Sequence, residues 1–377
     1  MDGGGRPVHH GRMRRWSDVL ARFDWTLLLA VLALTSVGLL AIYGISVARG
    51  ATELFQFKKQ LTAAGLGLVA ASVLAFVDYR HIRSLALPVY VVGFLILIAS
   101  LIFGTTLNGG GRWFILGPLS FQPVEFAKVC FVVFASQYLG RYVRKRLDWM
   151  PFLGSLFALL AYLVPILLQP DFGSGMVVVA AWAAMVLFAG LPKHAWWILT
   201  LVAAAMAPLV WMNLETYQKD RLLSFVNPAA HPRAAYNVTQ ARIAIGSGGV
   251  FGKGIGAGSQ ARLRFLPVAT SDFMFAVLGE EIGFIGIFGL LGIFGLLFFR
   301  LLRIGSAVPD PFAGLLVVGI VAILATHVAV NAGMNLGLVP VTGIPLPFVS
   351  AAASSMVTLY LLVGLAESVA VQRRTAS

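Results

Sequence analysis

The chain has 377 residues, of which 59% are hydrophobic and only 11% are charged. A soluble domain carries about 25% charged residues, so this composition excludes a soluble globular enzyme, a disordered protein and a coiled coil. The net charge of +13 fits basic loops on the cytoplasmic side of a membrane better than a nucleic-acid-binding surface. The single cysteine, Cys130, excludes an intrachain disulfide and a cysteine metal site.

Long apolar blocks predict helices that cross the hydrocarbon core of a membrane. In chain order these spans are Trp25–Ile45, Leu61–Phe76, Leu85–Phe103, Val124–Leu139, Phe152–Leu168, Ser174–Leu191, Trp196–Met212, Phe273–Phe299, Phe312–Val330 and Ser354–Val369. The first span is too long for the apolar core of a signal peptide, so we expect it to be retained. The expected fold class is an all-α polytopic membrane protein of about ten transmembrane helices, forming one integral-membrane domain over residues 1–377.

Basic residues gather on one side of these spans, in the N-terminal segment 1–24, the loops at 80–83 and 141–146, and the tail 370–377. This bias predicts that both termini are cytoplasmic. A long outer loop, 213–271, joins the seventh and eighth spans and is also strongly basic. Its charge suggests an anionic ligand on the outer face, although long translocated loops can also be basic without such a function.

Charged residues inside predicted spans are costly unless they are paired or face water. Glu125 and Lys128 lie at i and i+3 on the fourth span and therefore share a helix face. They either fix packing as a buried ion pair or line a polar cavity. Arg112 precedes them in a glycine-rich and proline-rich turn that re-enters the helix, and an arginine beside backbone amides suits a phosphate.

Three further groups of carboxylates lie near the ends of spans. Asp171 precedes the sixth span and is either a helix cap or a functional group. Asp272 lies where the long outer loop enters the eighth span, flanked by apolar residues, which would raise its pKa and make it a better base. Glu280 and Glu281 follow two turns deeper, and we expect at least one to form hydrogen bonds within the bundle.

Glycine-rich segments complete the outer face. The loop Gly246–Gly254 fails the phosphate-loop pattern, so close approach to a ligand and a flexible hinge remain equal alternatives. The eighth span repeats glycine every three residues from Gly283 to Gly295, which indicates close helix packing. The last outer loop, 335–348, has three prolines and no charge, and we expect a rigid cap or a re-entrant segment.

Five blocks of this sequence resemble the SEDS family of bacterial cell-wall polymerases. They are NGGGRWF with QPVEFAK (108–128), QPDFGSG (169–175), ARIAIGSGGVFGKGIG (241–256), TSDFMFAVLGEEIGFIG (270–286) and NLGLVPVTGIPLPFVS (335–350). The VTGIPLPF block is more similar to the elongation branch of the family than to the division branch. Two stretches depart from the family pattern: 350–355 lacks a Tyr-Gly-Gly, and Val268-Ala269 replaces part of an LPE-x-H-T stretch.

The resemblance implies ten helices and a peptidoglycan glycosyltransferase that polymerises lipid II at the outer face of the bacterial cytoplasmic membrane. Asp272 matches the essential aspartate of the family and is the expected general base for the acceptor hydroxyl. The expected substrate-binding residues are Arg112, Glu125, Lys128, Asp171, Arg221, Gln240, Arg242, Ser247, Lys253, Glu280, Glu281 and Ser350. Among these, the cations Arg112, Lys128, Arg221, Arg242 and Lys253 are the candidates for the pyrophosphate.

The expected partners are lipid II, an undecaprenyl-pyrophosphate-linked glycan, membrane lipids and a class B penicillin-binding protein, with no nucleic acid. No cofactor or dedicated metal site is required by the sequence, although a divalent cation such as Mg²⁺ or Mn²⁺ could assist. The alternative functions are a lipid II flippase, which would need polar groups along the full membrane depth and an internal repeat, a non-catalytic scaffold, and a division-type polymerase.

Overall fold

The computed structural model describes most of the chain. The described residues are 22–48, 54–107, 110–116, 119–143, 147–192, 195, 197, 200–201, 211–212, 214, 216–263, 265–266 and 268–372. The predicted seventh span, Trp196–Met212, lies largely outside these residues, as do most of the basic residues of segment 1–24 and of the tail. The total of ten spans therefore stays a prediction.

Within the described residues, eight helices are long and apolar enough to cross a membrane. They are α2 (Trp25–Ala48), α3 (Leu54–Phe76), α5 (Ala86–Phe103), α7 (Trp149–Leu168), α8 (Phe172–Ala189), α13 (Met274–Ser306), α14 (Pro311–Leu336) and α15 (Ala353–Gln372). Each overlaps a predicted span. A helix is the expected structure of such a span, because it satisfies its backbone polar groups without water. A ninth helix, α6 (Pro123–Gly140), covers the predicted fourth span and packs against α5, α8 and α14. The all-α membrane fold is confirmed.

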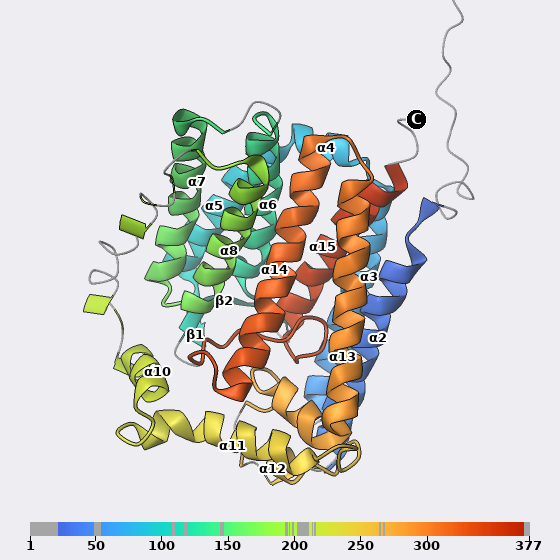
Figure 1. Cartoon of the computed structure of the whole chain (residues 1–377), viewed down its shortest axis with the longest axis vertical. Helices are drawn as coiled ribbons and strands as arrows, with labels where there is room; N and C mark the ends of the chain where they lie inside the picture. The colour runs from blue at the N-terminus through green and yellow to red at the C-terminus, as the bar shows by residue number, and fades with distance from the viewer. Residues whose placement is uncertain are drawn as a thin grey trace, which may run out of the picture.

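The centre of the bundle is formed by α15, whose residues are almost all buried (Figure 1). Its most extensive contact is with α3, far away in the sequence. Gly364 of α15 lies directly against Ala71, and a Cβ at Gly364 would come within 2.7 Å of the Ala71 backbone. The absence of a side chain there lets the two helices approach closely, as is common between membrane helices.

A small antiparallel sheet precedes α6. It contains β1 (Thr105–Leu107), β2 (Gly110–Leu116) and β3 (Leu119–Phe121), in that spatial order. The sequence predicted only a structured turn in this region. Lys59 of α3 donates a hydrogen bond to Ser120 of β3 at 2.8 Å, and the sheet is thereby tied to the bundle.

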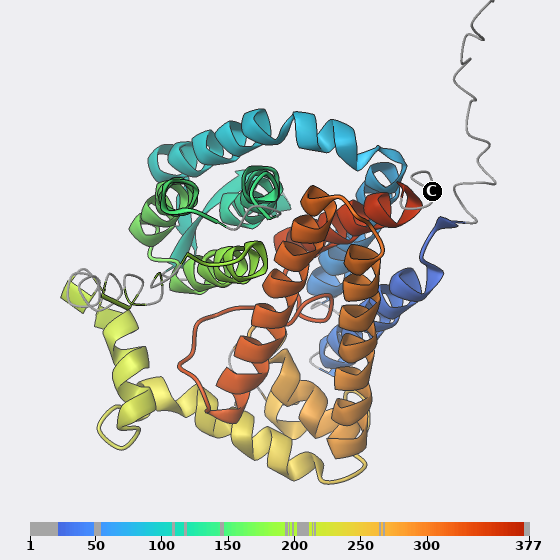
Figure 2. The same ribbon diagram turned by 45° about the horizontal axis from the view of Figure 1, so that its top comes forward.

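The two ends of the bundle differ. The short helix α4 (Tyr79–Ser84) lies at one end, beside the last turns of α15 (Figure 1). At the other end, the predicted long outer loop contains α10 (Thr216–Val226), α11 (Pro232–Gly248) and α12 (Ser259–Arg262), which run across the bundle rather than along it (Figures 1 and 2). The described part of the loop is thus an ordered cap over this end.

The long helix α13 is interrupted at Gly283, which has φ +64° and ψ −168°. The neighbouring loop replaces the lost helical hydrogen bonds. The amides of Lys253 and Gly254 donate to the carbonyl oxygens of Glu280 and Glu281, and the amides of residues 284–285 donate to those of residues 249–250. This pairing satisfies the backbone at the break and fixes the glycine-rich loop 246–254 against the bundle.

The glycine repeat on the rest of α13 does not serve the packing predicted from the sequence. A Cβ placed at Gly289, Gly292 or Gly295 would meet no other atom within 4 Å among the described residues. Among the described residues, the side of α13 that packs against other helices presents different residues, such as Leu290, Phe294 and Leu297, which are buried. The close helix packing predicted for these three positions is therefore not found among the described residues.

Candidate active site

Asp272 lies in the turn immediately before α13, beneath the cap formed by the outer-loop helices. Its side chain accepts a hydrogen bond from the Ser271 hydroxyl at 2.9 Å. Its backbone carbonyl oxygen accepts two more, from the side-chain amides of Asn331 (2.9 Å) and Asn335 (3.1 Å) on α14. Both asparagines are buried. The position of Asp272 is therefore fixed from α14 through its backbone, which leaves the carboxylate available.

Arg221 of α10 faces the Asp272 carboxylate. A Cβ placed at Gly343 would lie 3.5 Å from Oδ2 of Asp272 and 4.0 Å from Nη1 of Arg221, so the aspartate and the arginine flank this glycine. Burial raises the pKa of Asp272 above the ordinary 3.8, and this effect outweighs the Ser271 hydrogen bond and the charge of Arg221, which lower it. A carboxylate with a raised pKa is a stronger base than a solvated one.

A second polar cluster surrounds Lys128 of α6. Its ammonium group donates to Oε1 of Glu125 at 2.8 Å and lies 3.3 Å from Nε2 of His327 on α14. All three side chains are buried. A buried charge is tolerated when it is paired and hydrogen-bonded, so this cluster joins α6 to α14 with its charges balanced.

Asp171 completes this second cluster and acts as a helix cap. Its Oδ1 accepts from the amide of Ser174 at 3.0 Å, and its Oδ2 accepts from the Gln122 side chain at 3.2 Å. Burial raises the pKa of Asp171, while the Ser174 amide and the charge of Lys128 oppose the increase. The cap expected from the sequence is present, and it also places a carboxylate near Lys128.

The extended segment 342–345 connects the two clusters. Gly343 lies beside Asp272, as described above. The carbonyl oxygen of Ile344 accepts from Asn331 at 2.8 Å, and that of Pro345 lies 3.2 Å from Nδ1 of His327. A shift of this segment would therefore move the surroundings of Asp272 and, through His327, those of Lys128. This segment is non-helical, with Ile344 buried and its neighbours half-buried. Whether the last outer loop is a rigid cap or a re-entrant segment stays a prediction.

Glu280 and Glu281 form a third cluster, which holds the glycine-rich loop. Oε1 of Glu280 accepts from Lys253 Nζ at 2.8 Å and from the amide and hydroxyl of Ser259 at 2.9 Å each. Lys253 also donates to the Ser247 hydroxyl at 2.8 Å. Glu281 accepts from the amide of Gly256 at 2.9 Å. Both glutamates thus form hydrogen bonds within the protein, and Lys253 and Ser247 belong to this structural cluster.

Four predicted substrate-binding residues lie outside these clusters. Arg112 of β2 donates from Nη1 to the carbonyl oxygen of Gly104 at 3.0 Å, and its buried Nε has no partner among the described residues. Gln240 and Arg242 lie on α11, half-buried and exposed respectively. The Ser350 hydroxyl is buried and accepts from the amide of Leu346 at 2.9 Å, as part of a turn.

The described residues contain no group of three or more His, Cys, Asp or Glu side chains placed to hold a metal ion. The carboxylates of the three clusters are occupied instead by amides, hydroxyls and cations of the chain, as described above. Chemically, a carboxylate such as that of Asp272 can accept a proton, and the guanidinium of Arg221 across Gly343 can balance negative charge.

The sequence matches known proteins along almost its whole length. The FtsW/RodA/SpoVE family of cell cycle proteins matches residues 24–375. The chain is 34% identical to the probable peptidoglycan glycosyltransferase FtsW of Thiomicrospira cyclica, over 93% of this chain and 92% of the relative. It is 33% identical to the peptidoglycan glycosyltransferase MrdB of Escherichia coli, over 96% of each chain.

Solved structures match the fold as well. The rod shape determining protein RodA of Thermus thermophilus superimposes with a TM-score of 0.69 and 30% identity, over 93% of this chain and 97% of that chain. A chain from a structure of a peptidoglycan synthase complex that coordinates polymerization and crosslinking superimposes with a TM-score of 0.78 and 31% identity, over 94% of this chain and 98% of that chain.

Proposed function

The chain belongs to the FtsW/RodA/SpoVE family of peptidoglycan glycosyltransferases, and from this premise we propose that it polymerises lipid II into glycan strands at the outer face of the cytoplasmic membrane. The observation that carries the proposal is Asp272, a half-buried carboxylate at the mouth of the helix bundle. Its backbone is fixed by two buried asparagines, and its side chain faces Arg221.

In the proposed reaction, the 4-hydroxyl oxygen of the acceptor lipid II attacks the anomeric carbon of the donor sugar. The bond between that carbon and the pyrophosphate oxygen breaks, and undecaprenyl pyrophosphate leaves with the electron pair. Asp272 accepts the proton of the attacking hydroxyl. Because the hydroxyl is a weak nucleophile until it loses this proton, a positioned base of raised pKa supplies much of the acceleration.

The leaving pyrophosphate requires positive charge near the reacting atoms. Arg221 is the best-placed candidate, because it lies across Gly343 from Asp272. Lys128 is paired with Glu125 and contacts His327. We therefore propose that it shapes the wall of the site and makes it polar, rather than binding the pyrophosphate. Arg112 and Arg242 remain candidates for the path of the substrate, and a divalent cation brought by the pyrophosphate would add charge of the same sign.

We further propose a role in cell elongation, with a class B penicillin-binding protein as the crosslinking partner. The VTGIPLPF block favours the elongation branch, and the similarity to a RodA structure is consistent with it. The similarity to a chain of a peptidoglycan synthase complex supports the partner. The identities of 34% to an FtsW and 33% to MrdB are nearly equal, so the proposed elongation role rests on the VTGIPLPF block.

The test is polymerisation of purified lipid II by the purified protein in liposomes, followed on a gel that resolves glycan chain lengths. We expect a ladder of glycan strands without any added polymerase. A flippase would move labelled lipid II between leaflets and produce no ladder, and a scaffold would do neither. Movement without polymerisation would contradict the proposed function.

A further inference from the structure

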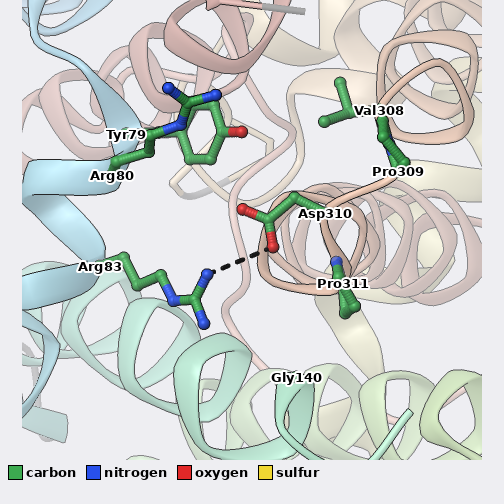
Figure 3. Close-up of a pocket in the computed structure, with 8 residues that line it drawn as sticks. All are labelled: Tyr79, Arg80, Arg83, Gly140, Val308, Pro309, Asp310 and Pro311. Atoms are coloured by element: carbon green, nitrogen blue, oxygen red, sulfur yellow. Dashed lines mark hydrogen bonds and ion pairs between the residues drawn. The ribbon is translucent and has the colours of Figure 1, made fainter. Parts of the chain in front are cut away.

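A pocket of about 450 Å³ opens at the end of α13 opposite Asp272, between segments that are far apart in the sequence. Three of its lining residues come from α4, one from the end of α6, three from the turn between α13 and α14 and one from the start of α14 (Figure 3). They are Tyr79, Arg80, Arg83, Gly140, Val308, Pro309, Asp310 and Pro311. None of these residues takes part in the three clusters of the candidate active site.

Two arginines of α4 are positioned by aromatic rings. The guanidinium of Arg80 lies 5.9 Å from the centre of the Tyr79 ring, and that of Arg83 lies 5.9 Å from the centre of the Phe312 ring. Tyr79 and Phe312 are themselves buried, and their rings stack with their centres 6.2 Å apart. The two guanidinium groups are therefore held near the pocket by a rigid aromatic pair.

The carboxylate that lines the pocket, that of Asp310, has its hydrogen bonds on one oxygen. Oδ1 of Asp310 accepts from the amide of Phe312 at 3.1 Å and so caps α14. The same oxygen receives Arg83 Nη1 at 3.4 Å, at the long end of the range for a hydrogen bond. A guanidinium has five N–H donors, and among the described residues Arg83 gives one to Asp310. The lining thus has one net positive charge and arginine donors to spare (Figure 3).

The position of the pocket indicates what reaches it. Its walls are the connections between spans: α4 joins α3 to α5, and residues 308–311 join α13 to α14. Such connections lie at the level of the lipid headgroups. The distribution of basic residues predicts that this end is cytoplasmic, and the cytoplasmic leaflet is the one that carries anionic lipid.

We propose that this pocket binds the phosphate group of an anionic phospholipid headgroup through Arg80 and Arg83. An arginine fork matches two phosphate oxygens, and the cavity exceeds a bare phosphate, so it leaves room for the glycerol of the headgroup. The phosphate would take the place of Asp310 as the main partner of Arg83. This proposal does not depend on the proposed function, because it uses only the pocket and the orientation of the chain.

The test is native mass spectrometry of the full chain in detergent, in three arms: with phosphatidylglycerol, with phosphatidylcholine, and with phosphatidylglycerol together with inorganic phosphate. We expect phosphatidylglycerol to remain bound at concentrations where phosphatidylcholine does not. Displacement of the lipid by inorganic phosphate at a similar concentration would overturn the lipid as the ligand and assign the site to the free anion. Equal retention of both lipids, with no effect of phosphate, would overturn the proposal.

Two variants with opposite expected effects on phosphatidylglycerol binding distinguish a loss of binding from a loss of fold. Arg80→Gln combined with Arg83→Gln should weaken phosphatidylglycerol binding about tenfold or more, since charge-assisted contacts to phosphate are lost. Asp310→Asn should strengthen it severalfold, because asparagine still caps α14 while the competing carboxylate charge is gone. Arg303→Gln, an exposed arginine at the same end of α13 but outside the pocket, is the control. A similar loss in Arg303→Gln and in the double variant, or weaker binding by Asp310→Asn, would contradict the site.

Discussion

At the scale of single residues, the account depends on how Asp272 is held. Asn331 donates to the carbonyl oxygens of Asp272 and Ile344, so Asn331→Ala leaves two buried acceptors without this donor. We expect kcat for lipid II polymerisation to fall about 10-fold to 100-fold through misplacement of the base, with KM nearly unchanged. Asn227→Ala, at an exposed turn, is the control. Loss of substrate affinity alone would show that Asn331 does not position the base.

The pKa of Asp272 gives a second prediction. A base acts when it is deprotonated, so the rate should rise with pH along an acid limb centred above 3.8, the ordinary value for aspartate. Arg221 lowers the pKa of Asp272, and Arg221→Gln should therefore move the acid limb to higher pH. Lys219→Gln, two residues away on α10, should leave the limb in place. An acid limb that moves to lower pH in Arg221→Gln would contradict the pairing.

The sequence predicted part of this site. Asp272 was identified because it lies between a polar loop and an apolar span, which is a property of its immediate neighbours. Asn331 and Asn335 were missed because the predicted ninth span ended at Val330, and helix α14 continues to Leu336. A polar residue at the end of an apolar block is indistinguishable from the first residue of a loop, unless the i and i+4 spacing of the two asparagines is noticed.

At the scale of elements, the break in α13 is open to a test with a matched pair of glycines. Gly283 has a positive φ and lies against the backbone of Gly252, so Gly283→Ala should destabilise the protein by about 1–3 kcal/mol for the strained backbone alone. Gly289→Ala lies in the same helix with open space around it and should be neutral or slightly stabilising. Thermal unfolding in detergent measures both. Equal melting temperatures would contradict the role of the break.

The elements differ in how well they could be predicted. Long apolar helices are specified by composition alone, so eight of the predicted spans were confirmed. The small sheet was missed because β1 and β3 have three residues each, too few to show alternation. The break at Gly283 was hidden because this residue is the first of five equally spaced glycines. Its positive φ angle and its contact with the Gly252 backbone, which distinguish it from Gly289 and Gly292, are visible only in the structure.

At the scale of the whole molecule, the predicted orientation can be measured by thiol labelling. The native Cys130 is buried, which gives a low background. In right-side-out vesicles, an impermeant maleimide should label Val226→Cys, at an exposed site on α10, and should label Ser306→Cys only after the membrane is opened. The opposite pattern would place the cap over Asp272 in the cytoplasm and remove access to an outer-face substrate.

The arrangement of the helices could not be predicted from the sequence. Lipid is as apolar as leucine, so the periodicity of an apolar helix does not reveal which face meets another helix. The packing of α15 against α3 uses close contacts of Gly364 with Ala71 and of Gly67 with Tyr360, which only the structure reveals. Asp272 and Arg221 lie close together only because of the path of the long outer loop, and no local sequence pattern determines that path.

The most direct test of the central claim is lipid II polymerisation by Asp272→Asn, with Asp220→Asn as the control. Both changes remove one carboxylate charge from the same end of the molecule, but Asp220 is exposed on α10 and contacts His231 rather than the candidate active site. We predict that Asp272→Asn lowers the rate of glycan synthesis by about 100-fold or more while its melting temperature and that of the control stay close to the unmodified protein. Glycan synthesis at the normal rate by a folded Asp272→Asn protein would contradict the assignment of Asp272 as the base.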